Sequence, residues 1–207
     1  MAQRPIEELP PHDRRRFFAA GVGRMLGPLV QYLEDRFPHL LPQDRTLMRP
    51  PGALPENAFL ETCLRCGQCA DACPAHAIAL HPPAGEPIDG TPFVDANVAA
   101  CVVCDELACM KACPSGALRL VGRLEIRMGL AVVDHTKCLR SNDEDCRICI
   151  DRCPLGATAI RIEDGRVRVL APEDDPENGR LGEGCVGCGV CQLYCPTRPR
   201  AIIVTPT

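Results

Sequence analysis

The chain has no tryptophan and very few other aromatic residues. Its 207 residues include five Phe and two Tyr, so aromatic side chains make up 3% of the total. Large buried rings and aliphatic side chains normally supply the apolar area that stabilises a domain of this size. A fold built from this sequence therefore needs an additional source of stability.

Two further features are missing. No apolar run approaches the roughly 20 residues that a helix needs to cross a bilayer. The formal net charge is only −4, so the chain lacks the strongly basic balance of a nucleic-acid-binding protein. The sequence therefore predicts no transmembrane span and no nucleic-acid partner.

Cysteine, in contrast, is abundant. The 16 Cys form four groups, each of which ends in Cys-Pro: Cys63, Cys66, Cys69 and Cys73; Cys101, Cys104, Cys109 and Cys113; Cys138, Cys146, Cys149 and Cys153; and Cys185, Cys188, Cys191 and Cys195. The closing cysteines recur about every 40 residues, which indicates an internal repeat. Four copies of one module account for nearly all of the chain after Thr62.

The spacing within the groups favours iron–sulfur clusters over other cysteine chemistry. The first and fourth groups have the ferredoxin run C-x2-C-x2-C-x3-C-P, in which three cysteines bind one cluster and the last binds its neighbour. Structural zinc uses two C-x2-C pairs, and secreted disulfide scaffolds are smaller and less regular. No group has the C-x3-C-x2-C spacing of radical-SAM proteins. All sixteen cysteines are therefore predicted to bind four [4Fe–4S] clusters.

Short segments of β pattern follow each Cys-Pro, at residues 77–80, 117–121, 157–162 and 201–204. Asp164-Gly165, between two alternating runs, predicts a hairpin. A short helix is expected before each closing cysteine. The repeated order of strand, cluster loop, short helix and strand predicts an α+β fold made of two ferredoxin-like 2[4Fe–4S] units.

The first 57 residues contain no cysteine and are predicted to form a helix and a linker ahead of the cluster region, 58–207. Apolar residues from Phe17 to Phe37 fall mostly at steps of three and four, which indicates an amphipathic helix, kinked at Pro28. We expect this helix to pack on the cluster region. Peripheral docking of residues 14–37 to a partner or a membrane surface is the alternative.

The run from Arg14 to Phe18 resembles a twin-arginine export signal. Arg24 interrupts the mildly apolar stretch that follows, and no small-residue cleavage site precedes the charged run Glu34-Asp35-Arg36. The sequence therefore predicts a cytoplasmic protein, with export to the periplasm as the alternative.

The residues around the cysteines carry a family resemblance. Gly90-Thr91-Pro92-Phe93, the run Cys109-Met110-Lys111-Ala112-Cys113-Pro114 and the widened group from Cys138 to Cys153 are similar to the polyferredoxins of periplasmic nitrate reductase and methylamine utilisation systems. The resemblance covers residues 58–204. It implies an electron carrier that acts beside membrane quinol-oxidising proteins and redox enzymes.

The resemblance also implies how the groups pair. The outer groups would form one unit, of residues 58–95 and 172–207, and the inner groups another, of residues 96–171. The ligand sets would then be Cys63, Cys66, Cys69 and Cys195; Cys101, Cys104, Cys109 and Cys153; Cys138, Cys146, Cys149 and Cys113; and Cys185, Cys188, Cys191 and Cys73. Spacing alone also permits consecutive pairing, first group with second and third with fourth.

The predicted function is the relay of single electrons between redox partners, within or beside a larger oxidoreductase complex. The partner would be a membrane quinol-oxidising protein or a reductase. No substrate site of its own is expected, because the G-x-G-x-x-G match from Gly182 to Gly187 follows an acidic loop instead of a strand and includes Cys185. The alternatives are a structural or maturation iron–sulfur protein, and an electron-input subunit whose catalytic site lies on another chain.

Overall fold

The computed structural model describes residues 45–172 and 184–207. The predicted helix of residues 17–37 and the twin-arginine sequence at Arg14–Phe18 therefore lie outside the described residues. Within these ranges no helix is long and apolar enough to span a membrane.

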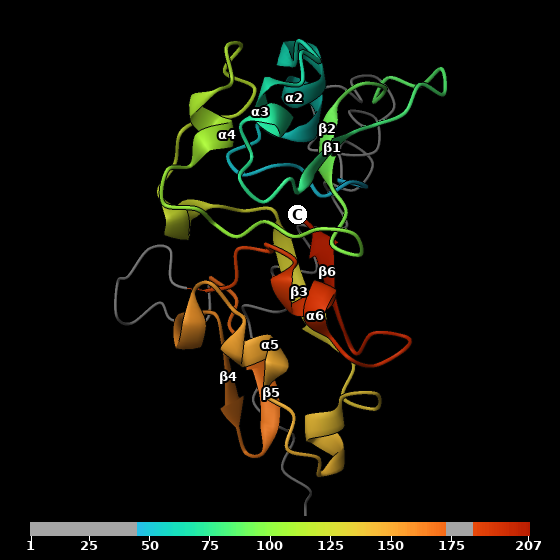
Figure 1. Cartoon of the computed structure of the whole chain (residues 1–207), viewed down its shortest axis with the longest axis vertical. Coiled ribbons are helices and arrows are strands. Elements are labelled where there is room, and N and C mark those ends of the chain that lie inside the picture. The colour runs from blue at the N-terminus through green and yellow to red at the C-terminus, as the bar shows by residue number, and fades with distance from the viewer. Residues whose placement is uncertain (1–44, 173–183) are drawn as a thin grey trace, which may run out of the picture. The chain divides into compact units, whose positions relative to one another are not determined.

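The described chain combines short helices with two-stranded sheets (Figure 1). The helices are α2 (Glu56–Thr62), α3 (Gln68–Asp71), α4 (Ala108–Lys111), α5 (Ile148–Asp151) and α6 (Val190–Tyr194), with 3-10 turns at Arg123–Glu125, Leu139–Asn142 and Gly156–Thr158. The strands are β1 (Ile78–Leu80), β2 (Pro92–Val94), β3 (Gly129–Val133), β4 (Ile160–Glu163), β5 (Arg166–Val169) and β6 (Ile202–Pro206). This mixture agrees with the predicted α+β class.

Each sheet is an antiparallel pair of strands. β1 pairs with β2, β4 with β5 and β3 with β6, and Val133 lies opposite Ile202 in the last pair. Asp164 and Gly165 join β4 to β5 with φ angles of 49° and 74°. Two positive φ angles are what a type I′ turn requires, and the predicted hairpin is confirmed.

The strand contacts repeat in chain order. The β1–β2 hairpin and an isolated bridge between Ala53 and Leu118 lie in the first half of the described chain, and the β4–β5 hairpin and the β3–β6 pair lie in the second. Each half thus has one hairpin and one long-range strand contact around two cysteine groups. Because β3 belongs to the predicted inner unit (96–171) and β6 to the outer one, the strand pairing does not follow that division.

The apolar core consists of two clusters of side chains. Phe59, Ile126 and Met128 are the largest completely buried apolar side chains of the first cluster. Ile160 and Ile202 belong to the second, smaller cluster. Cysteine side chains are members of both clusters. Several of the thiols therefore lie inside the core.

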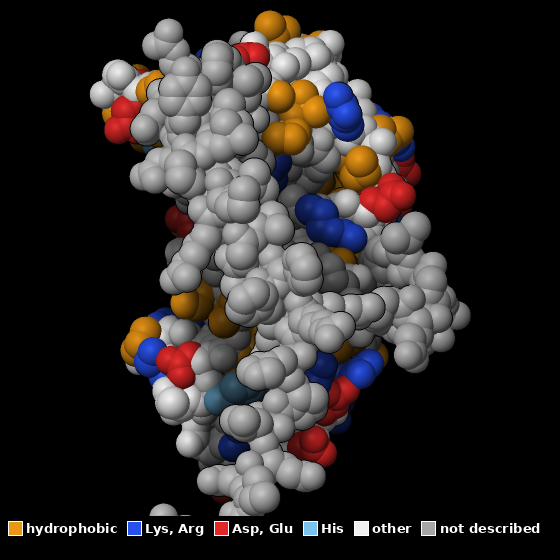
Figure 2. Space-filling model, turned by 180° about the vertical axis from the view of Figure 1, so that it is seen from behind, with side chains coloured by type: hydrophobic (Ala, Val, Ile, Leu, Met, Phe, Trp, Pro, Cys, Tyr) orange, Lys and Arg blue, Asp and Glu red, His pale blue; other side chains and the backbone are white. Residues whose placement is uncertain are grey.

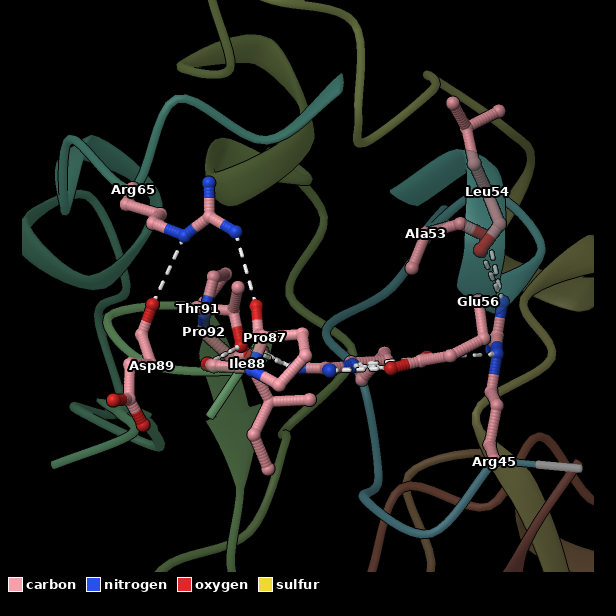
Figure 3. Close-up of polar contacts among 11 residues, drawn as sticks. Arg45, Ala53, Leu54, Glu56, Arg65, Pro87, Ile88, Asp89, Thr91 and Pro92 are labelled. Carbon is pink, nitrogen blue, oxygen red and sulfur yellow. Dashed lines mark hydrogen bonds and ion pairs between the residues drawn. The ribbon is translucent and has the colours of Figure 1, made fainter. Parts of the chain in front are cut away.

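A buried ion pair fixes the segment that precedes the first cysteine group. The Nε atom of Arg49, a fully buried residue, lies 3.1 Å from each carboxylate oxygen of Glu56. Arg49 also donates to Thr91 Oγ1 at 2.9 Å and to the Pro92 carbonyl at 3.0 Å, and its guanidinium lies 4.8 Å from the centre of the Phe59 ring. Figure 3 shows the acceptors of this network converging from α2 and from the start of β2. One guanidinium thus connects α2 to the β1–β2 hairpin.

We expect Arg49→Met to lower the free energy of unfolding by about 3–5 kcal/mol, because it leaves the buried Glu56 carboxylate without its main partner. Urea denaturation followed by circular dichroism measures this loss. The double variant R49M/E56L removes both charges and should recover most of the stability. A double variant as unstable as R49M would contradict the explanation from an unpaired charge.

Candidate metal centre

Cysteine side chains gather in fours around three hollows with mostly apolar walls. The first hollow is lined by Cys73, Cys101, Cys104 and Cys109, the second by Cys153, Cys185, Cys188 and Cys191, and the third by Cys138, Cys146, Cys149 and Cys195. The remaining cysteines are Cys63, Cys66, Cys69 and Cys113. Burial, together with the nearby Cys63 and Cys113 thiols, raises the pKa of Cys69 to about 11. Twelve of the sixteen predicted residues thus fall into three sets of four, and Cys63 and Cys113 lie near Cys69.

These sets correct the predicted pairing of outer with outer and inner with inner groups, which is wrong. Cys73 lies with the second group and not with Cys185, and Cys113 lies with the first group and not with Cys138. Cys153 likewise lies with the fourth group and Cys195 with the third. Consecutive groups therefore exchange their closing cysteines.

The hairpins give the physical reason for this exchange. The chain that leaves Cys73 enters β1, turns, and returns along β2 directly to Cys101. The β4–β5 hairpin follows Cys153, and the carbonyl of Leu170 just after β5 accepts the N–H of Cys185 at 2.7 Å. Pairing neighbouring groups closes shorter loops than pairing the first group with the fourth, so it costs less chain entropy.

The cysteine loops direct backbone N–H groups at sulfur. Arg65 and Val103 occupy the same place in the first and second groups, and both have positive φ, 54° and 49°. This conformation is rare for a β-branched residue. It aims the N–H of each residue at the sulfur two positions earlier, Cys63 Sγ and Cys101 Sγ, and both N···S distances are 3.4 Å. N–H groups in this position stabilise a thiolate over a thiol.

Burial acts against the thiolate form. It raises the pKa of Cys101 to about 11 and is the main reason why the pKa values of Cys109 and Cys188 rise to about 12. Neighbouring thiols contribute to the rise of all three pKa values. Thiolates at these positions therefore depend on the positive charge of a bound metal, whose binding releases the protons.

The arrangement fits a cluster and not a single ion. Among the described residues, no three His, Cys, Asp or Glu side chains stand close enough to hold one metal ion, and all sixteen cysteines are free thiols. Structural zinc draws its thiolates to about 2.3 Å from one atom. Four thiols spread around an apolar hollow match a cubane, which takes one thiolate at each iron corner. The residues present thus fit [4Fe–4S] clusters.

Two hydroxyl groups near closing cysteines were not predicted. Ser115 Oγ lies 3.6 Å from Cys113 Sγ, and Thr197 Oγ1 lies 3.2 Å from Cys195 Sγ. The available signal was the third residue of Cys-Pro-Ser and Cys-Pro-Thr, because the other two groups have Ala75 and Leu155 there.

Two iron–sulfur family models match the chain. A 4Fe-4S dicluster domain covers residues 62–117, and a 4Fe-4S binding domain covers residues 182–198. The first match spans the first two cysteine groups, in agreement with their exchange of closing cysteines. No solved structure shows significant similarity to the chain.

Curated relatives match over most of the chain. The methylamine utilization ferredoxin-type protein MauM of Paracoccus denitrificans is 38% identical over 172 residues, which are 80% of this chain and 74% of the relative. The ferredoxin-type protein NapG of Escherichia coli is 39% identical over 162 residues, 77% of this chain and 70% of the relative. The chain therefore belongs to the MauM and NapG family of ferredoxin-type iron–sulfur electron-transfer proteins.

Proposed function

We propose that the chain holds four [4Fe–4S] clusters and relays single electrons along them between redox partner proteins. The observation that carries this proposal is the gathering of twelve thiols in fours around three hollows, with Cys63 and Cys113 near Cys69. Each cluster, when bound, takes up and releases one electron. The chain's own residues hold the iron, direct N–H groups at sulfur and keep water out of the apolar hollows.

We name the sets by their place in the proposed relay: the first end set (Cys63, Cys66, Cys69, Cys113), the first middle set (Cys73, Cys101, Cys104, Cys109), the second middle set (Cys153, Cys185, Cys188, Cys191) and the second end set (Cys138, Cys146, Cys149, Cys195). Packing supports this order within each half. Helix α3 carries Cys69 of the first end set and packs against α4, which carries Cys109 of the first middle set. Helix α5 carries Cys149 of the second end set and packs against α6, which carries Cys191 of the second middle set.

The middle sets adjoin where the two halves of the described chain meet. Cys101 donates its N–H to the Cys188 carbonyl at 3.0 Å, and Met128 donates to the Val186 carbonyl at 3.0 Å. Gly187 permits this approach, because a Cβ there would lie 2.3 Å from the Gly129 nitrogen. The relay would therefore pass from one half to the other between Cys101 and Cys188.

Exposure favours electron exchange at the first end set. Cys66 is exposed, whereas Cys188 and Cys191 of the second middle set are buried. Leu64, in the same loop as Cys66, is 66% exposed and offers an apolar contact beside the cluster. On the part of the face in Figure 2 that is not grey, Lys and Arg side chains lie among Asp and Glu side chains. These features suit a protein partner that docks by shape and apolar contact.

The partner classes follow from sequence and family. A membrane quinol-oxidising protein or a reductase is the proposed partner, and the cytoplasm is the proposed compartment. MauM is named for methylamine utilization, and an equivalent supply of electrons to or from an oxidoreductase is proposed for this chain. The catalytic site of such a system would lie on another chain.

Reduction of the purified protein with dithionite, followed by EPR spectroscopy, tests the proposal. We expect signals of reduced [4Fe–4S] clusters that disappear on reoxidation and return on a second reduction. Clusters that assemble but never change oxidation state would instead indicate a structural or maturation role.

A further inference from the structure

The hydroxyl groups of Ser115 and Thr197 have equivalent positions in two of the four modules. Each residue comes two positions after a closing cysteine and lies against its sulfur, at 3.6 Å from Cys113 Sγ and 3.2 Å from Cys195 Sγ. Both sulfurs are partly or fully buried. A single donor near a buried sulfur acts with little competition from water.

The direction of these hydrogen bonds follows from the other contacts of the hydroxyl oxygens. Ser115 Oγ accepts the N–H of Ala117 at 3.3 Å, and Thr197 Oγ1 accepts the N–H of Ala201 at 2.8 Å. A cysteine that binds iron has lost its proton and can only accept. Each hydroxyl is thus held by the backbone with its own hydrogen free to point at the sulfur.

The other two modules lack this hydrogen bond. Ala75 and Leu155 stand two positions after Cys73 and Cys153 and carry no hydroxyl. Thr158, the nearest hydroxyl downstream of Cys153, donates to the Leu155 carbonyl at 2.8 Å instead. Since closing cysteines are exchanged, Cys113 belongs to the first end set and Cys195 to the second. Among the described residues, hydroxyl donors therefore reach a sulfur of each end set and no sulfur of a middle set.

Hydrogen bonds to sulfur are among the factors that set cluster potentials. A reduced cluster carries one more negative charge than an oxidised one, so a donor to its sulfur stabilises the reduced form. We propose that Ser115 and Thr197 raise the reduction potentials of the two end sets above those of the middle sets. This inference rests on the proposed function. Its consequence is that electrons reside at the ends of the relay, where partners exchange them, and cross the middle sets only in transit.

Redox titration of the full-length protein, monitored by EPR, tests this assignment. Ser115→Ala and Thr197→Val should each shift one of the four potentials to a more negative value and leave iron content unchanged. The conservative variants S115T and T197S keep the hydroxyl and should retain the original potentials. Ala75→Ser introduces a hydroxyl beside Cys73 and should move a third potential, of the first middle set, to a more positive value.

Unchanged potentials in both S115A and T197V would overturn the inference. If either of these variants loses a cluster, A75S decides, because it removes no contact: an unshifted potential in A75S would also overturn it. Failure of the unmodified protein to accept electrons would instead refute the proposed relay, so the two failures are distinguishable.

Discussion

Removal of the iron and sulfide is expected to unfold the chain. In the described ranges the longest helix, α2, has seven residues, and every sheet has two strands. Isolated helices need roughly 12–15 residues, and isolated two-stranded hairpins are marginal in water. Both apolar clusters contain cysteine side chains. Without the clusters, the side chains that remain cannot offset the entropy of ordering the loops.

Oxidation with ferricyanide in the presence of a chelator prepares the cluster-free protein. We expect loss of amide dispersion in NMR spectra and loss of a cooperative thermal transition in circular dichroism. Incubation with iron, sulfide and a thiol reductant should restore both, which controls for chemical damage to the chain. A cluster-free protein that still melts cooperatively would contradict this prediction.

Replacement of Cys101, Cys104 and Cys109 by alanine should remove one cluster, or about four iron atoms per chain. In that background we expect Cys73→Ala to release no further iron, because Cys73 belongs to the set already emptied. Pairing of the outer groups predicts a different iron content. Cys73 would then bind the cluster of the fourth group, and its replacement would damage a second cluster.

Cys113→Ala in the same triple-alanine background is the matched control. Cys113 belongs to the first end set, so its replacement should alter a second cluster. Iron and sulfide analysis with EPR spectroscopy reports both results. Further iron loss in the Cys73→Ala variant, equal to that in the control, would contradict consecutive exchange.

The sequence indicated which cysteines share a loop but not which closing cysteine lies with them, for a physical reason. The C-x2-C spacing indicates which cysteines share one loop, because three thiols of that loop must reach the same cluster. It does not state which closing cysteine completes the set. The hairpins between the groups determine which closing cysteine it is. The connection between β1 and β2 is long, and its sequence is typical of an exposed loop.

Side chains organise that connection. Asp89 accepts N–H groups from Ala84 at 2.8 Å and Glu86 at 3.0 Å, and Arg65 donates to the carbonyls of Asp89 at 2.9 Å and Pro87 at 3.0 Å. Figure 3 shows Arg65 of the first cysteine loop above this turn. The contacts of Arg65 join residues 22 and 24 positions apart, which leave no periodic pattern, so local propensity could not reveal them.

Other elements show the same limit. The Asp164-Gly165 hairpin was predictable because its turn residues are local and specific. Residues 117–121 were predicted as a strand, but only Leu118 forms a bridge, to Ala53. The buried Arg49–Glu56 pair lies outside every cysteine motif, and the sequence offered no sign of it.

Coulometric titration of the full-length protein, with iron and sulfide analysis of the same sample, tests the central claim most directly. Four redox-active clusters predict about sixteen iron atoms and about four electrons per chain. Fewer than four electrons in a sample with full iron content would contradict the relay, because at least one cluster would then take up no electron.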